Sequence, residues 1–356
     1  SSKEAPYIQR NIEATRAAYG LSDVKVSDYQ ATIETSAGQL KNDLATISNI
    51  RLLDPNVVPS TFRQLQQIKP YYNFADSLDV DRYTIDGAKR DSVVAVRELN
   101  IEGNPARNWI NDHLVYTHGF GFVSALGNTI DADGKPTFSV GDIPPTSGLG
   151  TFQPRIYFGE NVPDYSIIGG AKGGSPTELD YPDDKSANGQ KNYTYTGEGG
   201  VPMGSLFTRL LFAIKYQEQR IVLSNLINSD SKILFNRNPS ERVAKVAPWL
   251  TLDGNIYPAV VDGRILWIVD GYTTSNGYPY SKKTNLATAT TNTISANTTS
   301  VDALASRNIS YMRNSVKATV DAYDGTVKLY QWDTKDPVLA TWSKAFPGTV
   351  TPKSAM

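Results

Sequence analysis

The chain has 356 residues, with 35 lysines and arginines against 36 aspartates and glutamates, and no cysteine. A hydrophobic share of 40% is enough for a packed core, so a fully disordered chain is excluded. The net charge of -1 gives no electrostatic footprint for nucleic acid. The absence of cysteine excludes disulfides, thiolate metal sites and cysteine nucleophiles.

Four shorter helices are expected from apolar spacing and end signals. In residues 4–19, Pro6 lies in the first turn and Gly20 supplies a stop. Residues 60–68 form a second helix, which Pro70 ends. A third begins at Asn238 with proline next and ends before Pro248, and the fourth covers residues 337–345.

Three Asp-Gly pairs separate strand-like segments and predict antiparallel hairpins. They are Asp86-Gly87, Asp262-Gly263 and Asp324-Gly325. The residues expected to be buried in these hairpins are Val93, Val260, Ile265, Trp267, Val320 and Leu329. Of the loop glycines, we expect Gly263 but not Gly173 to need a positive φ. A strand over residues 29–33 is also indicated.

One long amphipathic helix is predicted over residues 205–228, with Leu206, Leu210 and Ile214 on its apolar stripe. Its charges are too frequent for a membrane span, so we expect it to cross the β layer as the central helix of the core. The alternative is that the stripe docks onto a transmembrane part outside this chain, or onto a partner, and is exposed in the isolated domain. Together with the hairpins, these helices predict an α+β fold of antiparallel hairpin-rich layers.

Two segments have the composition of loops. Residues 169–190 are rich in Gly, Pro, Asp and Ser, and residues 284–300 are rich in Thr and Asn. We therefore expect a main domain over residues 1–283, a flexible loop over 284–300, and a C-terminal hairpin and helix over 301–356 that pack on the main domain.

The only two histidines, His113 and His118, are candidates for an acid/base or metal group with Asp112. Their offset of five residues places them about 140° apart on a helix, whereas two ligands on one face need an offset of four. Packed or surface histidines are therefore the favoured interpretation. A helix break near Tyr116 would bring the two rings together.

Other local patterns indicate weaker sites. Asp131 and Asp133 fit a turn that could hold a cation, and Asp184 begins a segment like a calcium loop whose twelfth position is Tyr195 rather than glutamate. Residues 169–174 match a phosphate loop only in composition. Exposed tyrosines such as Tyr272, Tyr278 and Tyr280 suit glycan or protein contacts, although rings that cap the β core explain them better. No cofactor is expected.

Five long segments resemble a known family. They are DPNVVPSTFRQLQQ (residues 54–67), NWINDHLVYTHG (108–119), QPRIYFGE (153–160), APWLTLDG (247–254) and VKATVDAYDGTVKLY (316–330). Together they resemble the extracytoplasmic region of uncharacterised protein family 0182, bacterial multi-pass membrane proteins common in actinobacteria. The resemblance implies a place on the outer face of the cell membrane and the protein's own transmembrane region as a partner. It transfers no catalytic residue.

Two functions follow as hypotheses. The first is an extracytoplasmic domain that serves binding, assembly or transport in the cell envelope, with an envelope protein or a glycan as partner. The alternative is an envelope hydrolase acting on a glycan or phosphate ester through Asp112, His113 and His118. The alternative predicts that these three side chains converge in one cleft with a further carboxylate.

Overall fold

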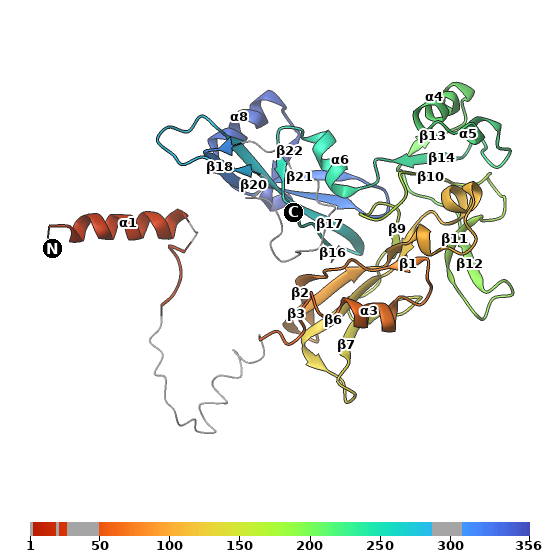
Figure 1. Ribbon diagram of the computed structural model, residues 1–356, viewed down its shortest axis with the longest axis horizontal. Coiled ribbons are helices and arrows are strands. Elements are labelled where there is room, and N and C mark those ends of the chain that lie inside the picture. Colours follow the sequence, from red (N-terminus) through yellow and green to blue (C-terminus); the bar gives the residue numbers. More distant parts are fainter. Residues whose placement is uncertain (1–2, 19–20, 27–49, 287–307) are drawn as a thin grey trace. The chain divides into compact units, whose positions relative to one another are not determined.

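The computed structural model describes residues 3–18, 21–26, 50–286 and 308–356 (Figure 1). The chain divides into two compact units, residues 1–48 and residues 49–356. In the first unit, helix α1 spans Ala5–Ala18, which confirms the first predicted helix. The strand predicted over residues 29–33 lies outside the described residues.

The second unit contains a five-stranded antiparallel sheet in the order β2-β3-β6-β7-β8 (Figure 1). Its strands are β2 (Asp79–Ile85), β3 (Ala88–Val96), β6 (Phe122–Ile130), β7 (Pro136–Gly141) and β8 (Thr146–Ser147). Helix α3 (Pro59–Gln66) covers this sheet because Phe62, which is fully buried, packs with Val93 and Val123.

A six-stranded sheet forms the other large layer. Its strands are β15 (Thr251–Leu252), β16 (Tyr257–Val261), β17 (Arg264–Ser275), β20 (Tyr311–Asp321), β21 (Val327–Gln331) and β22 (Val350–Pro352). The pairings are antiparallel except β21 with β22. Helices α6 (Pro239–Val246) and α8 (Pro337–Ala345) pack on it through Val243 and Leu339. Both begin with proline, whose fixed φ suits the first helical position.

The main core lies between these two sheets. Val94 and Phe122 of the first sheet share one buried cluster with Trp267 and Val320 of the second. The antiparallel sheets with separate helices confirm the predicted α+β fold class.

All three Asp-Gly pairs join antiparallel neighbours, as predicted: β2 with β3, β16 with β17, and β20 with β21. Of the residues expected to be buried there, five are buried, and Val260 is partly buried against the same core. The expectation that only Gly263 needs a positive φ was wrong, because φ is 74° at Gly263 and 78° at Gly173.

Smaller ladders complete the unit. Strand β14 (Lys232–Phe235) pairs with β10 (Tyr165–Ile168) and β13 (Val201–Pro202). The two-stranded ladders are β1 (Tyr72–Asn73) with β4 (Glu98–Leu99), β5 (Gly119–Phe120) with β9 (Arg155–Ile156), β11 (Glu178–Pro182) with β12 (Gln190–Tyr193), and β18 (Thr284–Asn285) with β19 (Asn308–Ile309). Short 3-10 turns cover Ile101–Gly103 and Lys353–Ala355. The β11–β12 hairpin corrects the expectation that residues 169–190 form only a loop.

The long helix predicted over residues 205–228 is two helices, α4 (Leu206–Tyr216) and α5 (Arg220–Leu223). Between them Gln217 takes a left-handed conformation with φ of 52°. The apolar stripe is exposed, with Leu206 at 67% and Ile214 at 66% of full exposure. The prediction of a central core helix was therefore wrong, and the exposed stripe is the alternative stated for it.

The domain boundaries expected from the sequence stay a prediction. Most of the loop predicted over residues 284–300 lies outside the described residues. On its C-terminal side, β20 pairs with β17 from Tyr311 to Asp321, so residues 311–331 share a sheet with residues 251–275.

Candidate functional site

Asp112 and His113 lie in a single π-helical turn, Asn111–Val115. Asn108 begins this turn, because its carbonyl and its side-chain oxygen accept hydrogen bonds from the backbone N–H groups of Asp112 and Asn111. The buried Trp109 anchors the turn, and its indole N–H donates to the Tyr165 hydroxyl at 2.8 Å. The two candidate side chains are thus held by local capping and by one long-range contact.

The imidazole of His113 is stacked on the ring of Tyr165, with 4.0 Å between centroids and 3° between planes. Its Nδ1 lies 3.0 Å from the Tyr165 carbonyl, which can only accept, so Nδ1 carries the proton. Burial lowers the pKa of His113 despite this hydrogen bond and the nearby Asp112 carboxylate. The ring is therefore neutral at pH 7, and Nε2 presents a lone pair.

Asp112 is held by Arg107, whose Nε and Nη2 both donate to Oδ2 at 3.1 Å. Nη1 of the same arginine lies 2.6 Å from Oε1 of Glu102. The other carboxylate oxygen of Asp112, Oδ1, is buried without a hydrogen-bond partner among the described residues. A buried acceptor without a donor costs about 1–3 kcal/mol, so Oδ1 of Asp112 lowers the local stability of this turn.

Both side chains line one surface cavity of about 450 Å³. The other polar residues that line the cavity carry amide or charged groups, and the rest of the lining is apolar. The lining residues are Asn73, Leu99, Asn100, Ile101, Glu102, Arg107, Asp112, His113, Asn161, Val162 and Pro163. We call this the Asp112–His113 cavity.

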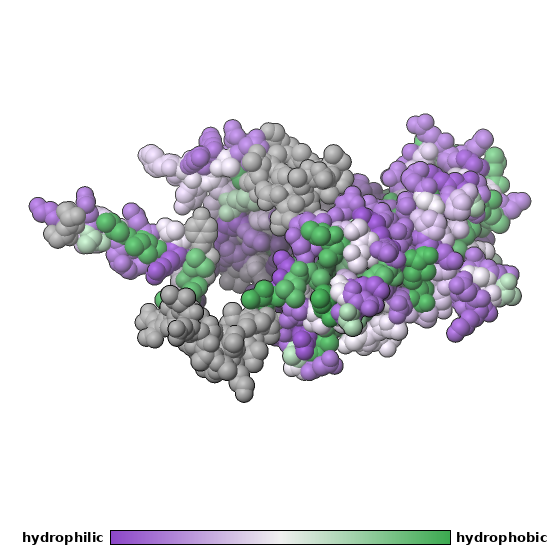
Figure 2. Space-filling model, turned by 60° about the horizontal axis from the view of Figure 1, so that its bottom comes forward, coloured by the Kyte–Doolittle hydropathy of each residue, from purple (hydrophilic) through white to green (hydrophobic). Residues whose placement is uncertain are grey.

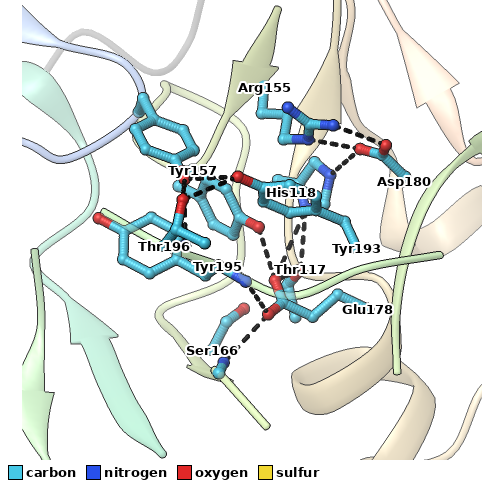
Figure 3. Close-up of polar contacts among 12 residues, drawn as sticks. Thr117, His118, Arg155, Tyr157, Ser166, Glu178, Asp180, Tyr193, Tyr195 and Thr196 are labelled. Atoms are coloured by element: carbon cyan, nitrogen blue, oxygen red, sulfur yellow. Dashed lines mark hydrogen bonds and ion pairs between the residues drawn. The ribbon is translucent and has the colours of Figure 1, made fainter. Parts of the chain in front are cut away.

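His118 does not line this cavity and lies in a buried polar cluster (Figure 3). Its Nε2 is 3.3 Å from Oδ1 of Asp180, and its Nδ1 is 2.9 Å from the Thr117 hydroxyl. Figure 3 shows the ring between the carboxyl groups of Asp180 and Glu178. The structure thus brings Asp112 and His113 together and places His118 in a different environment.

Four donors satisfy the buried Glu178 carboxylate. Oε2 accepts from the hydroxyls of Thr117 (3.0 Å) and Tyr157 (2.6 Å). Oε1 accepts from the backbone N–H groups of Gly169 (3.0 Å) and Tyr195 (2.9 Å). Because the Thr117 proton goes to Glu178, the Thr117 oxygen must accept from Nδ1 of His118.

Asp180 is equally well satisfied. Nε and Nη2 of Arg155 donate to its two oxygens at 2.6 and 2.7 Å. Burial alone would raise the pKa of Asp180, but the hydrogen bonds from His118 and Arg155 outweigh it and lower the pKa. Nε2 of His118 lies 3.3 Å from the same carboxylate, so the histidine and the arginine approach Asp180 together. The cluster therefore joins β9 and β11 to the segment that precedes β5, which is a structural role.

The predicted tyrosines have three different environments. The Tyr272 hydroxyl donates to Asp253 at 2.5 Å and is partly buried. Tyr278 is exposed and stacks on Tyr311, and Tyr280 is fully exposed with φ of 57°. Among the described residues these three rings line none of the cavities described here.

The predicted cation sites form hydrogen bonds within the protein. Oδ1 of Asp131 accepts the backbone N–H groups of Asp133 and Lys135, which closes the β6–β7 turn. Asp133 pairs with Lys135 at 3.3 Å, and the exposed Asp184 lies 4.0 Å from Lys69. No group of three or more histidines and carboxylates in the described part of the chain could hold a metal ion.

Sequence reasoning missed the residues that surround His118. Glu178 and Asp180 alternate with apolar neighbours in β11, but they belong to the segment assigned to a loop. Arg155 lies in β9 and Tyr157 follows that strand. Both residues come close to His118 because β9 pairs with β5, which begins directly after His118. The alternation in Glu-Leu-Asp-Tyr was the one available signal.

Two further acids, the buried Glu98 and the partly buried Asp79, lie near the main core. Burial raises the pKa of Glu98 to about 7, against hydrogen bonds from the backbone of Asn161 and Glu160. Burial likewise raises the pKa of Asp79 to about 7. Both groups line a very small cavity of about 10 Å³ beside Trp267, which has no room for a substrate.

The model of one protein family, described as "Uncharacterised protein family (UPF0182)", matches residues 1–356. The chain belongs to this family. A UPF0182 protein of Bifidobacterium adolescentis is 53% identical over 349 residues, which are 97% of this chain and 32% of that protein. UPF0182 proteins of Arthrobacter sp. (strain FB24) and Streptomyces coelicolor are 52% and 49% identical, over 99% of this chain and 36% and 35% of theirs.

This UPF0182 chain spans about a third of the length of the curated relatives it matches. No solved structure matches it. In the described part of this family member, no helix combines the length and the hydrophobicity needed to cross a membrane.

Proposed function

We propose that this chain is the extracytoplasmic domain of a multi-pass membrane protein of the bacterial cell envelope. The proposal is supported by the family resemblance and by relatives that are about three times as long as this chain. The remaining two thirds of such a protein would supply the transmembrane region as a partner. The domain itself would lie on the outer side of the cell membrane.

Within the envelope, the domain binds a polar, hydroxyl-rich ligand in the Asp112–His113 cavity. The observation that carries this proposal is a cavity of about 450 Å³ that is lined by Asp112, His113 and several amide groups. Nε2 of His113 offers a lone pair, and the amide groups of Asn73 and Asn100 line the same wall. Sugar hydroxyls donate and accept hydrogen bonds, so an envelope glycan fits this chemistry.

Hydrolysis of a glycan or phosphate ester is the second candidate function. The specific observation in its favour is that Asp112 and a neutral His113 line the same cavity, where the imidazole could act as a base. His118 takes no part in this candidate, because it is buried in the Glu178–Asp180 cluster. Arg107 engages Oδ2 of Asp112, which favours a binding role over a catalytic one.

The test uses saturation-transfer NMR of the purified chain with a hydrolysate of the organism's envelope polysaccharides. We expect transfer to sugar protons that falls at least tenfold in His113→Phe, which keeps the stacking on Tyr165 but removes Nε2. Asp133→Asn, on an exposed turn outside the cavity, is the matched control and should bind as the wild type does.

Absence of any signal that depends on His113 would contradict the binding proposal. Release of new reducing ends from the intact polysaccharide, lost in both Asp112→Asn and His113→Phe, would instead support hydrolysis. Unchanged thermal midpoints of the variants are required for either conclusion.

A further inference from the structure

Helices α4 and α5 present an apolar surface at one end of the second unit (Figure 1). Seven large apolar side chains on and after these helices are exposed, between 48% and 70% of full exposure: Leu206, Phe207, Leu210, Leu211, Ile214, Leu223 and Leu226. We call them the α4–α5 face. In Figure 2 the end of the unit that holds these helices shows a narrow hydrophobic strip at the edge of a mainly hydrophilic surface.

The opposite side of the two helices is packed in the ordinary way. Ala213 and Ile221 are buried with Trp109, Tyr165 and Ile233 in one cluster. The helices are therefore firmly attached to the unit by one side. The exposed apolar side chains take no part in this packing, and a group of large exposed apolar side chains on one helix pair indicates a binding surface.

The charges around the face are mainly positive. Helix α4 contains Arg209 and Lys215 and has no acidic residue. Arg209 donates to the carbonyls of Met203 and Ile227, so its charge is not neutralised by a carboxylate there. In α5, Arg220 is paired with Glu218 at 2.6 Å. The net charge of the helix pair is thus positive.

A groove of about 770 Å³ opens between the two helices. Its apolar lining includes Leu210, Ile214, Val222 and Leu223, and its polar lining comes from residues 217–220, which include the Glu218–Arg220 pair. An apolar groove with cationic groups at its edge suits a lipid, whose acyl chain is apolar and whose phosphate is anionic. A soluble protein partner would not require apolar and cationic groups side by side on the same surface.

We propose that the α4–α5 face lies in the interface of an anionic phospholipid bilayer. Leucine and phenylalanine side chains of α4 enter the boundary between head groups and acyl chains, and Lys215 lies at the level of the lipid phosphates. An amphipathic helix with basic residues and large apolar side chains binds membranes in this way, by buried apolar area and electrostatic attraction. This inference does not depend on a ligand in the Asp112–His113 cavity.

Vesicle flotation of the purified chain tests the proposal. The probes are vesicles of phosphatidylglycerol and phosphatidylcholine in equal parts, and vesicles of phosphatidylcholine alone. We expect binding to the anionic vesicles, at least tenfold weaker binding to the neutral ones, and at least tenfold weaker binding of Leu210→Glu. Because Leu210 is half exposed, this variant should keep the wild-type thermal midpoint.

The matched control is Ile8→Glu, since Ile8 is an exposed apolar residue of α1, a helix that also contains arginines. Ile8→Glu should bind anionic vesicles as the wild type does. The proposal is overturned if Ile8→Glu abolishes binding while Leu210→Glu does not, or if wild-type chain binds neither vesicle. It is also overturned if the chain forms a dimer that Leu210→Glu dissociates, because a second copy would then cover the face.

Discussion

Nε2 of His118 lies 3.3 Å from Oδ1 of Asp180, in a cluster where both side chains are buried. The same carboxylate accepts two hydrogen bonds from Arg155, so a guanidinium and an imidazole both contact one anion. Removing one partner from such a buried set leaves uncompensated charge, which is far costlier than the loss of a surface pair. We therefore expect the domain to lose stability when the Asp180 charge is removed, either by substitution or by acid.

We expect Asp180→Asn to destabilise the domain by about 3–5 kcal/mol at pH 7, because Arg155 and His118 lose their anionic partner. The folded pKa of Asp180 is lowered below its ordinary value of 3.8, so its contribution is present above pH 3.8 and is lost as the pH falls through the folded pKa. Urea midpoints measured from pH 7 to pH 3 should show a constant difference between wild type and variant above about pH 4 and a smaller difference at pH 3. Asp184→Asn, at an exposed position, should stay within about 0.5 kcal/mol at every pH. A constant difference for Asp180→Asn down to pH 3 would contradict this account.

The contribution of Glu98 to stability should depend on pH in the opposite sense to that of Asp180. Its folded pKa is raised to about 7 from an ordinary value of 4.5, so its contribution is full below pH 4.5 and is lost as the pH rises through 7. Glu98→Gln resembles the protonated acid and should become more stable relative to wild type between pH 5 and pH 8. Thermal midpoints at the two pH values measure this. An equal midpoint difference at both would show that burial leaves the titration of Glu98 unchanged.

The corrected position of α4 predicts a contrast between two neighbouring helices. Ile221 is fully buried, so Ile221→Ala should cost about 2–5 kcal/mol. Leu210 is half exposed, so Leu210→Ala should stay within about 0.5 kcal/mol. Denaturant midpoints of the two variants provide the comparison. Similar large losses in both would mean that the α4–α5 face is covered in solution.

Gly173 and Gly325 have nearly the same φ, so substitutions at the two positions distinguish the cost of backbone strain from the cost of steric overlap. Gly325 has φ of 74° and Gly173 has φ of 78°. A Cβ at Gly325 would lie 2.5 Å from the Phe158 ring, whereas a Cβ at Gly173 would meet nothing within 4 Å. Alanine should therefore cost about 1–2 kcal/mol at Gly173 and about 1–3 kcal/mol more at Gly325. Calorimetric midpoints that are equal for the two variants would contradict the overlap with Phe158.

Local sequence signals accounted for much of the fold. The three Asp-Gly turns predict their hairpins because the required backbone angles are set by two adjacent residues, such as Asp262 with φ of 48° and Gly263. Helix α6 follows from Asn238, whose side chain accepts the Glu241 N–H, and from the proline after it. These elements depend on few long-range contacts.

The predictions were wrong where contacts between residues far apart in the sequence determine the structure. Periodicity predicts an apolar face on residues 205–228, but it does not indicate whether a sheet covers that face. The left-handed Gln217 that divides the helix has no sequence signal, because glutamine rarely takes this conformation. Likewise, the spacing of His113 and His118 could not reveal that Tyr165 and Asp180, from separate ladders, hold the two rings apart.

The central claim is that this domain lies on the outer side of the cell membrane. The chain contains no cysteine, so Asp133→Cys places a single thiol within it, on the exposed β6–β7 turn. In intact cells that produce the full-length protein, a membrane-impermeant maleimide should label this variant and leave the protein without the substitution unlabelled at this site. Labelling of Asp133→Cys only after the membrane is permeabilised would contradict the account.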